Sequence, residues 1–422
     1  MSDAPRQSAA RTALAGLIGN VLEWFDFAVY GYFVVTIGKH FFPATDPTAS
    51  TLFAYGSLLI GFLGRPIGSV VLGLVGDRIG RRALLTVSIA LMGVATLAIG
   101  VLPTYETIGV AALILLVLCR IIQGFSLGGE FTGSMVYTTE LASPLMRGLI
   151  SSSTAAGTTL GFILGSFTAY IINKTLGPAD AAEWGWRIPF IASVLLCVAG
   201  WFLRSGIHES EAGEKAAEKR TPWLSSLVAD WKPVLQTFGI VGLTNAAYYI
   251  VFQYVVDERK KVENAVASDF QLANTLSLFA VLLAKPLGGW LSDKFGRRRL
   301  MMILQLVAMA AVVPALHIMT TGSITTFMAG QIILAIPLGM ALGLQGAMLV
   351  EIFPLRTRVT SMSIAYSLSL ALSGGAAPLI SKWLNATYHE PLLPAFYVLV
   401  YGVLGIVIMA SMRETNGRSL NE

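Results

Sequence analysis

Apolar runs long enough to cross a lipid bilayer recur along this chain, and they constrain its fold more than any other feature. A transmembrane helix needs about 20 mostly apolar residues, and in lipid only helices and closed barrels satisfy their backbone polar groups. The runs are continuous and lack a period-two alternation, which predicts helices. The twelve expected spans are 12–36, 50–74, 83–102, 108–138, 149–172, 187–204, 233–256, 269–292, 300–319, 324–349, 358–383 and 394–412.

Composition supports this interpretation. Of the 422 residues, 55% are hydrophobic and 13% are charged, whereas a soluble protein has about 25% charged residues. The sequence therefore predicts an all-α integral membrane protein. The net charge of +5 does not indicate a nucleic-acid partner, because the basic residues lie in short loops between spans. Cys119 and Cys197 fall inside spans and are expected to be free thiols, and no metal-ligand spacing is present.

The loops divide the chain and orient it. Most of the 29 Lys and Arg residues fall in loops on one side of the expected spans. By the positive-inside rule this predicts a multi-pass protein with both termini in the cytoplasm. The longest polar connection separates spans six and seven. We therefore expect an N-terminal six-helix bundle at 1–204, a cytoplasmic linker at 205–232 and a C-terminal six-helix bundle at 233–422.

An internal repeat relates the two expected bundles. "GLVGDRIGRR" after the second span matches "GWLSDKFGRR" after the eighth, displaced by 216 residues. Glu140 and Arg147 follow the fourth span with the same spacing as Glu351 and Arg358 after the tenth, displaced by 211 residues. Two features at nearly equal displacement indicate a duplicated six-span unit. The predicted fold is therefore twelve transmembrane helices in two pseudo-symmetric six-helix bundles.

Charged residues within the spans are the strongest functional signal. A charge at bilayer depth costs at least ~2.5–3.5 kcal/mol, so such residues face a cavity or a partner. Three acids and three cations are expected at this depth, and they are Glu23, Asp26, Glu130, Arg65, Arg120 and Lys285. Static ion pairs that fix helix packing are the alternative. We favour cavity chemistry because desolvation can exceed the attraction within a buried pair.

At this point the sequence resembles the major facilitator superfamily. Its "GxxxDRxGRR" motif occurs in both halves, and four further stretches resemble the metabolite:proton symporter family within that superfamily. These are "GNVLEWFDFAVYGYF", "RPIG" (65–68), "RIIQGFSLGGEFTG" (120–133) and "GWRIPF" (185–190). The resemblance covers the whole chain. It implies secondary active transport of a small organic acid or zwitterion, inward with protons.

Gating residues are expected at the cytoplasmic ends of the spans. Asp77, with Arg78 and Arg81, could hold the cytoplasmic side shut, and Asp293 is the repeat partner of Asp77. Plain topological anchoring is the alternative for the arginines. The spacing also favours ion pairs within each half, which would join Glu140 to Arg147 and Glu351 to Arg358. Solvated loop charges are the alternative there, because surface pairs contribute only ~0–1 kcal/mol.

Roles in transport can be proposed for the charges within the spans. Asp26 and Glu23, followed by Glu130, are the candidates to carry the proton, and Arg65, Arg120 and Lys285 are candidates to hold a substrate carboxylate. Hydrogen-bonding candidates lie on the same helix faces or on the repeat-related span seven, and they are Asn20, Tyr30, Gln123, Asn245, Tyr249 and Gln253. For any one of them an interhelical hydrogen bond is the alternative.

We therefore expect a monomeric carrier of a bacterial inner membrane, working by alternating access, that imports a small carboxylate-bearing metabolite such as a dicarboxylate or oxo-acid with protons. The alternative is a proline- or betaine-type zwitterion symporter, or proton-coupled efflux. Zwitterion carriers of the family have similar charges, so the charges alone do not decide. A transport-dead sensor and a channel are further alternatives. No nucleophile elbow, phosphate loop or metal cluster indicates an enzyme, and no cofactor is expected.

Overall fold

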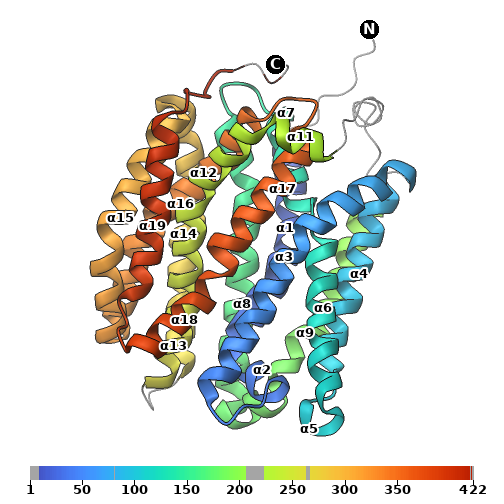
Figure 1. The fold of residues 1–422 in the computed structure, drawn as a ribbon, viewed down its shortest axis with the longest axis vertical. Coiled ribbons are helices and arrows are strands. Elements are labelled where there is room, and N and C mark those ends of the chain that lie inside the picture. The colour runs from blue at the N-terminus through green and yellow to red at the C-terminus, as the bar shows by residue number, and fades with distance from the viewer. Residues whose placement is uncertain (1–8, 80, 206–222, 263–266, 419, 421–422) are drawn as a thin grey trace.

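The computed structural model describes residues 9–79, 81–205, 223–262, 267–418 and 420, and in these residues every regular element is a helix. Figure 1 shows the long helices running roughly parallel, in two groups that lie side by side. We call residues 9–205 the N-half and residues 223–420 the C-half. The helices α8, α14 and α17 lie where the two halves meet.

The N-half contains the first six spans in the expected order. Its long helices are α1 (Ala9–Tyr32), α3 (Pro47–Ile79), α4 (Arg81–Val101), α6 (Val110–Ser126), α7 (Glu130–Leu141), α8 (Arg147–Glu183) and α9 (Ile188–Ser205). The short elements α2 (Val34–Phe41), α5 (Tyr105–Ile108) and η1 (Gly185–Arg187) lie at the end of the bundle away from Arg147. Span four is interrupted between α6 and α7. A Cβ at Gly128 in this break would lie 2.3 Å from the Ser69 nitrogen, so only glycine allows α3 to approach so closely.

The C-half contains the last six spans, and two of them include a π-helical segment. Span seven consists of α12 (Trp231–Tyr249), η2 (Ile250–Tyr254) and α13 (Val255–Val262). Span eleven consists of α17 (Arg358–Leu370), η3 (Ala371–Gly375) and α18 (Ala377–Tyr388). The others are α14 (Ala267–Phe295), α15 (Arg297–Thr321), α16 (Ile324–Ile352) and α19 (Leu393–Ala410). π-Helical turns often mark functional sites.

Within the described residues, nine helices are long and apolar enough to cross a membrane, and α1 and two shorter apolar segments in α4 and α9 complete the expected twelve. The expected linker at 205–232 is described only in part. Residues 206–222 lie outside the described residues, and Trp223–Ala229 form the short helix α11. The boundaries proposed for the two bundles stay predictions.

Candidate functional site

A buried ion pair joins α1 to α3 in the N-half. Arg65 Nη1 lies 3.0 Å from Glu23 Oε1, and both side chains are at most 2% exposed. The guanidinium carbon of Arg65 also lies 4.9 Å from the centre of the Trp24 ring and 4.7 Å from that of Phe27. Aromatic faces attract cations, and the attraction grows when water is excluded. The Arg65 cation is therefore stabilised by one carboxylate and by the rings around it.

A second buried cluster joins α1 to α4 and α6. Gln123 Nε2 donates hydrogen bonds to Asp26 Oδ2 at 2.5 Å and to Thr96 Oγ1 at 2.8 Å. Arg120 Nη1 donates to Gln123 Oε1 at 2.7 Å and lies 3.9 Å from Asp26 Oδ2. The guanidinium carbon of Arg120 lies 4.1 Å from the centre of the Tyr30 ring. Gln123 thus stands between the acid and the base and hydrogen-bonds to both.

The ring of Phe27 connects the two clusters. It lies 4.7 Å from the guanidinium carbon of Arg65 and 4.6 Å from that of Arg120. The structure therefore brings together four of the six charges expected within the spans, and it places both ion pairs inside one half. Glu130 begins α7 and is half-buried, and Lys285 lies in the C-half.

Lys285 lies apart from the two ion pairs. Its side chain is 1% exposed, and Nζ donates hydrogen bonds to the Ala155 carbonyl and to Thr158 Oγ1, both on α8 of the N-half. No carboxylate of the described residues lies within 4.0 Å of Nζ. Lys285 also lines a cavity of about 30 Å³ between the halves. The cavity wall is formed by Trp24, Phe131, Met135, Ala155, Thr158, Phe162, Asn245, Tyr248, Tyr249, Lys285, Leu342, Gln345 and Tyr366.

The remaining hydrogen-bonding candidates divide into two groups. Asn245 and Tyr249 line the cavity. Asn20 donates to Ser134 Oγ at 3.1 Å, and the Tyr30 hydroxyl is hydrogen-bonded to Ser57, so these two make contacts within the N-half. Gln253 lies on η2, outside the cavity lining.

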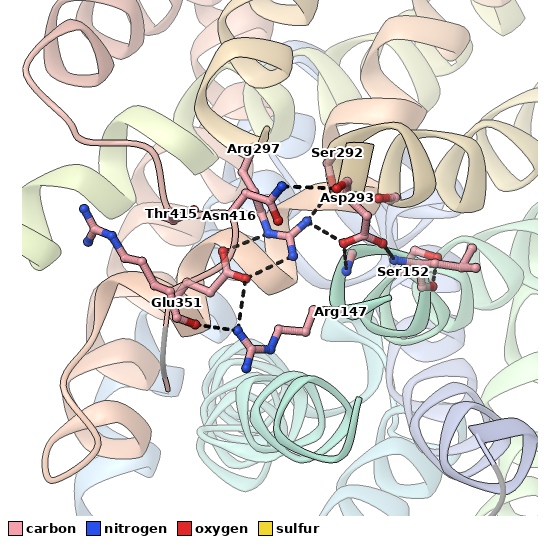
Figure 2. A network of polar contacts seen from close by, with 12 residues as sticks. Arg147, Ser152, Ser292, Asp293, Arg297, Glu351, Thr415 and Asn416 are labelled. Atoms are coloured by element: carbon pink, nitrogen blue, oxygen red, sulfur yellow. Dashed lines mark hydrogen bonds and ion pairs between the residues drawn. The ribbon is translucent and has the colours of Figure 1, made fainter. Parts of the chain in front are cut away.

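The halves contact each other at the end of the molecule that carries Asp293, which we call the Asp293 end (Figure 2). Asp293 on α14 accepts hydrogen bonds from the backbone nitrogens of Gly148 at 2.8 Å and Leu149 at 3.0 Å, at the start of α8. Arg297 donates to Asp293 at 2.9 Å and to Glu351 at 2.8 Å. The Asp293 carboxylate thus binds the N-terminus of a helix, where free N–H groups and the helix dipole favour an anion.

The expected pairing of Glu140, Arg147, Glu351 and Arg358 within each half is wrong. Arg358 Nη1 lies 2.7 Å from Glu140 Oε1, and Arg147 Nη1 lies 4.0 Å from Glu351 Oε1, so both pairs cross between the halves. The reason is geometric: the ends of α7 and α8 face those of α16 and α17 across the interface. Arg147, Glu351 and Arg358 are less than 10% exposed, so these three are not solvated loop charges, whereas Glu140 is exposed.

Three gating candidates cannot be placed and two further features were missed. The side chains of Asp77, Arg78 and Arg81 lie outside the described residues. Arg297 was not predicted as a gating residue, although it is the first arginine of the "GRR" in the second copy of the motif.

The segment after α19 was also missed, and it folds onto the Asp293 end. Glu414 Oε1 accepts hydrogen bonds from the backbone nitrogens of Arg297, Arg298, Thr415 and Asn416. Partial burial acts to raise the pKa of Glu414, but these N–H donors outweigh it and hold the pKa below its ordinary value.

The same segment reaches two of the crossed arginines. Arg147 Nη1 donates to the Arg418 carbonyl at 2.7 Å, and Arg358 Nη2 donates to the Leu420 carbonyl at 2.8 Å. The chain after α19 therefore lies over the contact between the halves.

The halves also contact each other at the opposite end, which we call the Asp257 end. Tyr55 on α3 donates to Asp257 Oδ2 on α13 at 2.8 Å, and Tyr32 on α1 donates to the Phe252 carbonyl at 3.1 Å. A Cβ on Gly31 would lie 1.2 Å from Gln253 Nε2, so this amide lies directly against α1. The cavity that Lys285 lines therefore has contacts between the halves on both sides of it, at the Asp293 end and at the Asp257 end.

Comparison with known proteins identifies the family. Residues 12–220 match the family model "Sugar (and other) transporter", and residues 237–420 match "Major Facilitator Superfamily". The proline/betaine transporter of Salmonella typhimurium is 32% identical over 419 residues, which cover 96% of this chain and 84% of that protein. The chain belongs to the major facilitator superfamily. The resemblance that the motifs indicated is confirmed.

Other members of the superfamily extend the comparison. The citrate-proton symporter of Klebsiella pneumoniae is 33% identical, over 92% of this chain and 88% of that protein. The glycine betaine/proline/ectoine/pipecolic acid transporter of Dickeya dadantii is 31% identical over 96% of this chain and 83% of that protein. The proton:xylose symporter XylE, solved with 6-bromo-6-deoxy-D-glucose, has a TM-score of 0.76, with 98% of each chain covered and 20% identity, and so shows the shared fold.

These findings confirm the twelve-helix fold in two bundles and make the protein a multi-pass membrane transporter with bacterial relatives. The prediction of a non-enzyme agrees with the family and with the relatives' names. Proton coupling is part of the name of the citrate-proton symporter and of the proton:xylose symporter XylE.

Proposed function

We propose that this protein is a proton-coupled symporter for a small zwitterion of the proline/betaine type. The observation that carries the proposal is the lining of the cavity between the halves, which combines aromatic side chains with one cation among the described residues. Six aromatic side chains line it, and they are Trp24, Phe131, Phe162, Tyr248, Tyr249 and Tyr366. Aromatic cages bind quaternary ammonium groups through cation–π attraction. Lys285 stands in the same wall as the counter-charge for a carboxylate.

The first expectation, a dicarboxylate or oxo-acid, has less support than this alternative. A dicarboxylate needs two cations, and Lys285 is the only charged residue among the described residues that line the cavity. Arg65 and Arg120 pair with Glu23 and Asp26 inside the N-half. Several relatives are named as proline, betaine or ectoine transporters. Citrate remains the second candidate because one relative is a citrate-proton symporter.

We assign the proton to Asp26. Its carboxylate lies between Gln123, which donates a hydrogen bond to it, and Arg120, which lies 3.9 Å away rather than in direct contact. A carboxylate held at this separation from its cation can take up a proton as an O–H group without moving Arg120. Glu23 contacts Arg65 directly at 3.0 Å and is the second candidate.

In the proposed cycle, residues 1–204 and 233–422 rock as two bodies about the cavity in a monomer. The contacts at the Asp293 end and at the Asp257 end open in turn, because a site open to both sides at once would leak. Substrate enters when one end opens, since a cavity of about 30 Å³ has room for water but not for a metabolite. Import into the cytoplasm is the direction that we propose.

Purified protein in liposomes with a trapped pH dye tests the proposal. Glycine betaine, proline, citrate and succinate are added separately to the outside. Internal acidification with betaine or proline but not with the carboxylates is the expected result. Acidification with citrate alone would favour the second candidate and overturn the zwitterion proposal. Uptake of a radiolabelled substrate without acidification would show that transport is not coupled to protons.

A further inference from the structure

The helices α8 and α14 form a continuous contact between the two halves (Figure 1). Gly148 and Gly289 meet near the Asp293 end, where a Cβ on either would lie 2.4 Å from the other's carbonyl oxygen. Further along the same helices, Ser166 and Thr275 are hydrogen-bonded at 2.7 Å. Lys285 lies between these contacts, at the point where the helices border the cavity.

Lys285 binds across this contact. Its ammonium group sits on the C-half, and both of its hydrogen-bond acceptors, the Ala155 carbonyl and Thr158 Oγ1, sit on the N-half. A lysine ammonium has three donors and is strongly hydrated in water. Here it is buried, and no described carboxylate lies within 4.0 Å of it. Two neutral oxygens compensate a buried cation less well than a carboxylate does, because a carboxylate accepts the same hydrogen bonds and also supplies the opposite charge.

We propose that Lys285 ties α14 to α8 in the closed form, and that the carboxylate of the transported zwitterion takes over its ammonium group and releases the tie. The inference rests on the proposed function for the identity of the carboxylate. It adds a link between binding and movement: the group that recognises the substrate is also a group that holds the halves together.

The acceptors on α8 can lose Lys285 at little cost. Thr158 Oγ1 also donates a hydrogen bond to the Ala155 carbonyl at 2.7 Å. After Lys285 leaves, both atoms therefore keep a partner within their own helix, and no buried polar group is orphaned. The exchange moves one cation from a neutral pair of oxygens to an anion, while α8 stays intact.

Two substitutions without substrate test the tie. Lys285→Met keeps the length of the side chain and removes its donors, and Thr158→Val removes one acceptor and keeps the shape. Thr175→Val is the matched control, because Thr175 is on the same helix and donates only to Ile171 within it.

The measured quantity is the distance between two spin labels, one on each half, in protein reconstituted into liposomes. All variants also carry Cys119→Ser and Cys197→Ser, so that only the introduced cysteines are labelled. One pair at Leu145→Cys and Leu355→Cys reports on the Asp293 end, and a second pair at Thr107→Cys and Thr321→Cys reports on the Asp257 end. All four positions are exposed. Labels at both ends detect opening on either side.

Lys285→Met should raise the ratio of open to closed molecules at one end by about tenfold, the scale of a hydrogen bond to a charged group, and Thr158→Val by about fivefold. Thr175→Val should leave the distances unchanged. Unchanged distances in both test variants, with helical circular dichroism showing that they are folded, would overturn the tie.

Substrate then tests the exchange. Glycine betaine should lengthen the distance between the spin labels in the protein that has Lys285, but not in the Lys285→Met variant. Choline has the same trimethylammonium group but no carboxylate, and it should change the distance in neither protein. Equal responses to betaine and choline, or a full response of Lys285→Met to betaine, would overturn the inference while leaving the proposed function intact. If the protein transports no zwitterion in the dye assay but opens with citrate through Lys285, the proposed function fails and the tie stands.

Discussion

Arg358 of the C-half hydrogen-bonds to Glu140 of the N-half at 2.7 Å, although the arginine seven residues after Glu140 is Arg147. Arg147 in turn faces Glu351 across the interface. Each half thus supplies one acid and one base to the other half, and the duplicated motif forms a contact with two-fold pseudo-symmetry. Separating the halves at the Asp293 end breaks both pairs at once, so these charges report directly on opening.

Reversing one crossed charge should open the Asp293 end. Arg358→Glu places two acids against each other, and the open population should rise about fivefold or more, because even partly exposed pairs contribute up to ~1 kcal/mol and like charges repel. The distance between labels at Leu145→Cys and Leu355→Cys measures this population.

The double reversal is the control for the pairing itself. Glu140→Arg combined with Arg358→Glu should restore much of the closed population, whereas Glu390→Arg, an exposed acid on another loop, should have no effect. Equal opening in the single and the double variant would show that the pair does not hold the halves closed.

Neutralising Asp26 should uncouple transport from protons. Asp26→Asn keeps an oxygen that can accept the hydrogen bond from Gln123, but it cannot gain and lose a proton. Uptake driven by a pH gradient should therefore fall to the background, while exchange of labelled for unlabelled substrate continues. Asp180→Asn, at an exposed position, is the control. Unchanged acidification in the dye assay with Asp26→Asn would mean that another acid carries the proton. Glu23→Gln would then be the next variant to measure.

The aromatic side chains that line the cavity should be required for binding the ammonium group of the substrate. The ring of Tyr249 packs edge-on against Phe62 and Phe162, and its hydroxyl has no hydrogen-bond partner among the described residues. Tyr249→Phe should therefore leave KM nearly unchanged, whereas Tyr249→Leu should raise KM for betaine by about fivefold or more, as expected for a desolvated cation–π contact. Initial uptake rates at several betaine concentrations give KM for both variants. A normal KM with Tyr249→Leu would exclude this ring from the binding site.

A methyl group on Gly31 should prevent closure at the Asp257 end. The Cβ would lie 1.2 Å from Gln253 Nε2, so the amide would have to move out of the contact between the halves. Overpacking of this kind costs about 1–3 kcal/mol, which is about fivefold or more in the closed population. Gly31→Ala should lengthen the distance between labels at Thr107→Cys and Thr321→Cys, and the further change Gln253→Ala should reverse this. No reversal would mean that another neighbour of Gly31 blocks closure.

The fold was largely predictable because it depends on local properties of the sequence. Apolar runs of membrane length give the spans, and the repeated motif gives the two halves. The breaks within spans were not predicted, because no proline or charged residue marks the π-helical segments Ile250–Tyr254 and Ala371–Gly375. Their geometry depends on what packs against them, and a hydropathy pattern does not contain that information.

The site was predictable as a set of residues but not as a set of contacts. The charges within the spans could be found because each is costly in lipid. Which acid meets which base depends on the lateral order of the helices, and the chain order does not specify it. Glu23 therefore pairs with Arg65, whereas Lys285 binds a backbone carbonyl. The crossed pairs show the same limit, because nearness in sequence favoured the wrong partner.

The contact that Glu414 makes with the start of α15 should weaken in acid. Its folded pKa lies below the ordinary value for glutamate because backbone N–H groups bind the carboxylate. A lowered folded pKa means that the stabilisation is complete above the unfolded pKa and is lost as the pH falls through the folded pKa. The melting temperature of Glu414→Gln should therefore lie below that of the unchanged protein at pH 7, and the difference should narrow as the pH falls below about 4.5. Differential scanning fluorimetry across this range measures both, and Glu390→Gln, an exposed acid, should show a smaller difference. A constant difference at every pH would mean that the glutamine variant loses packing rather than charge.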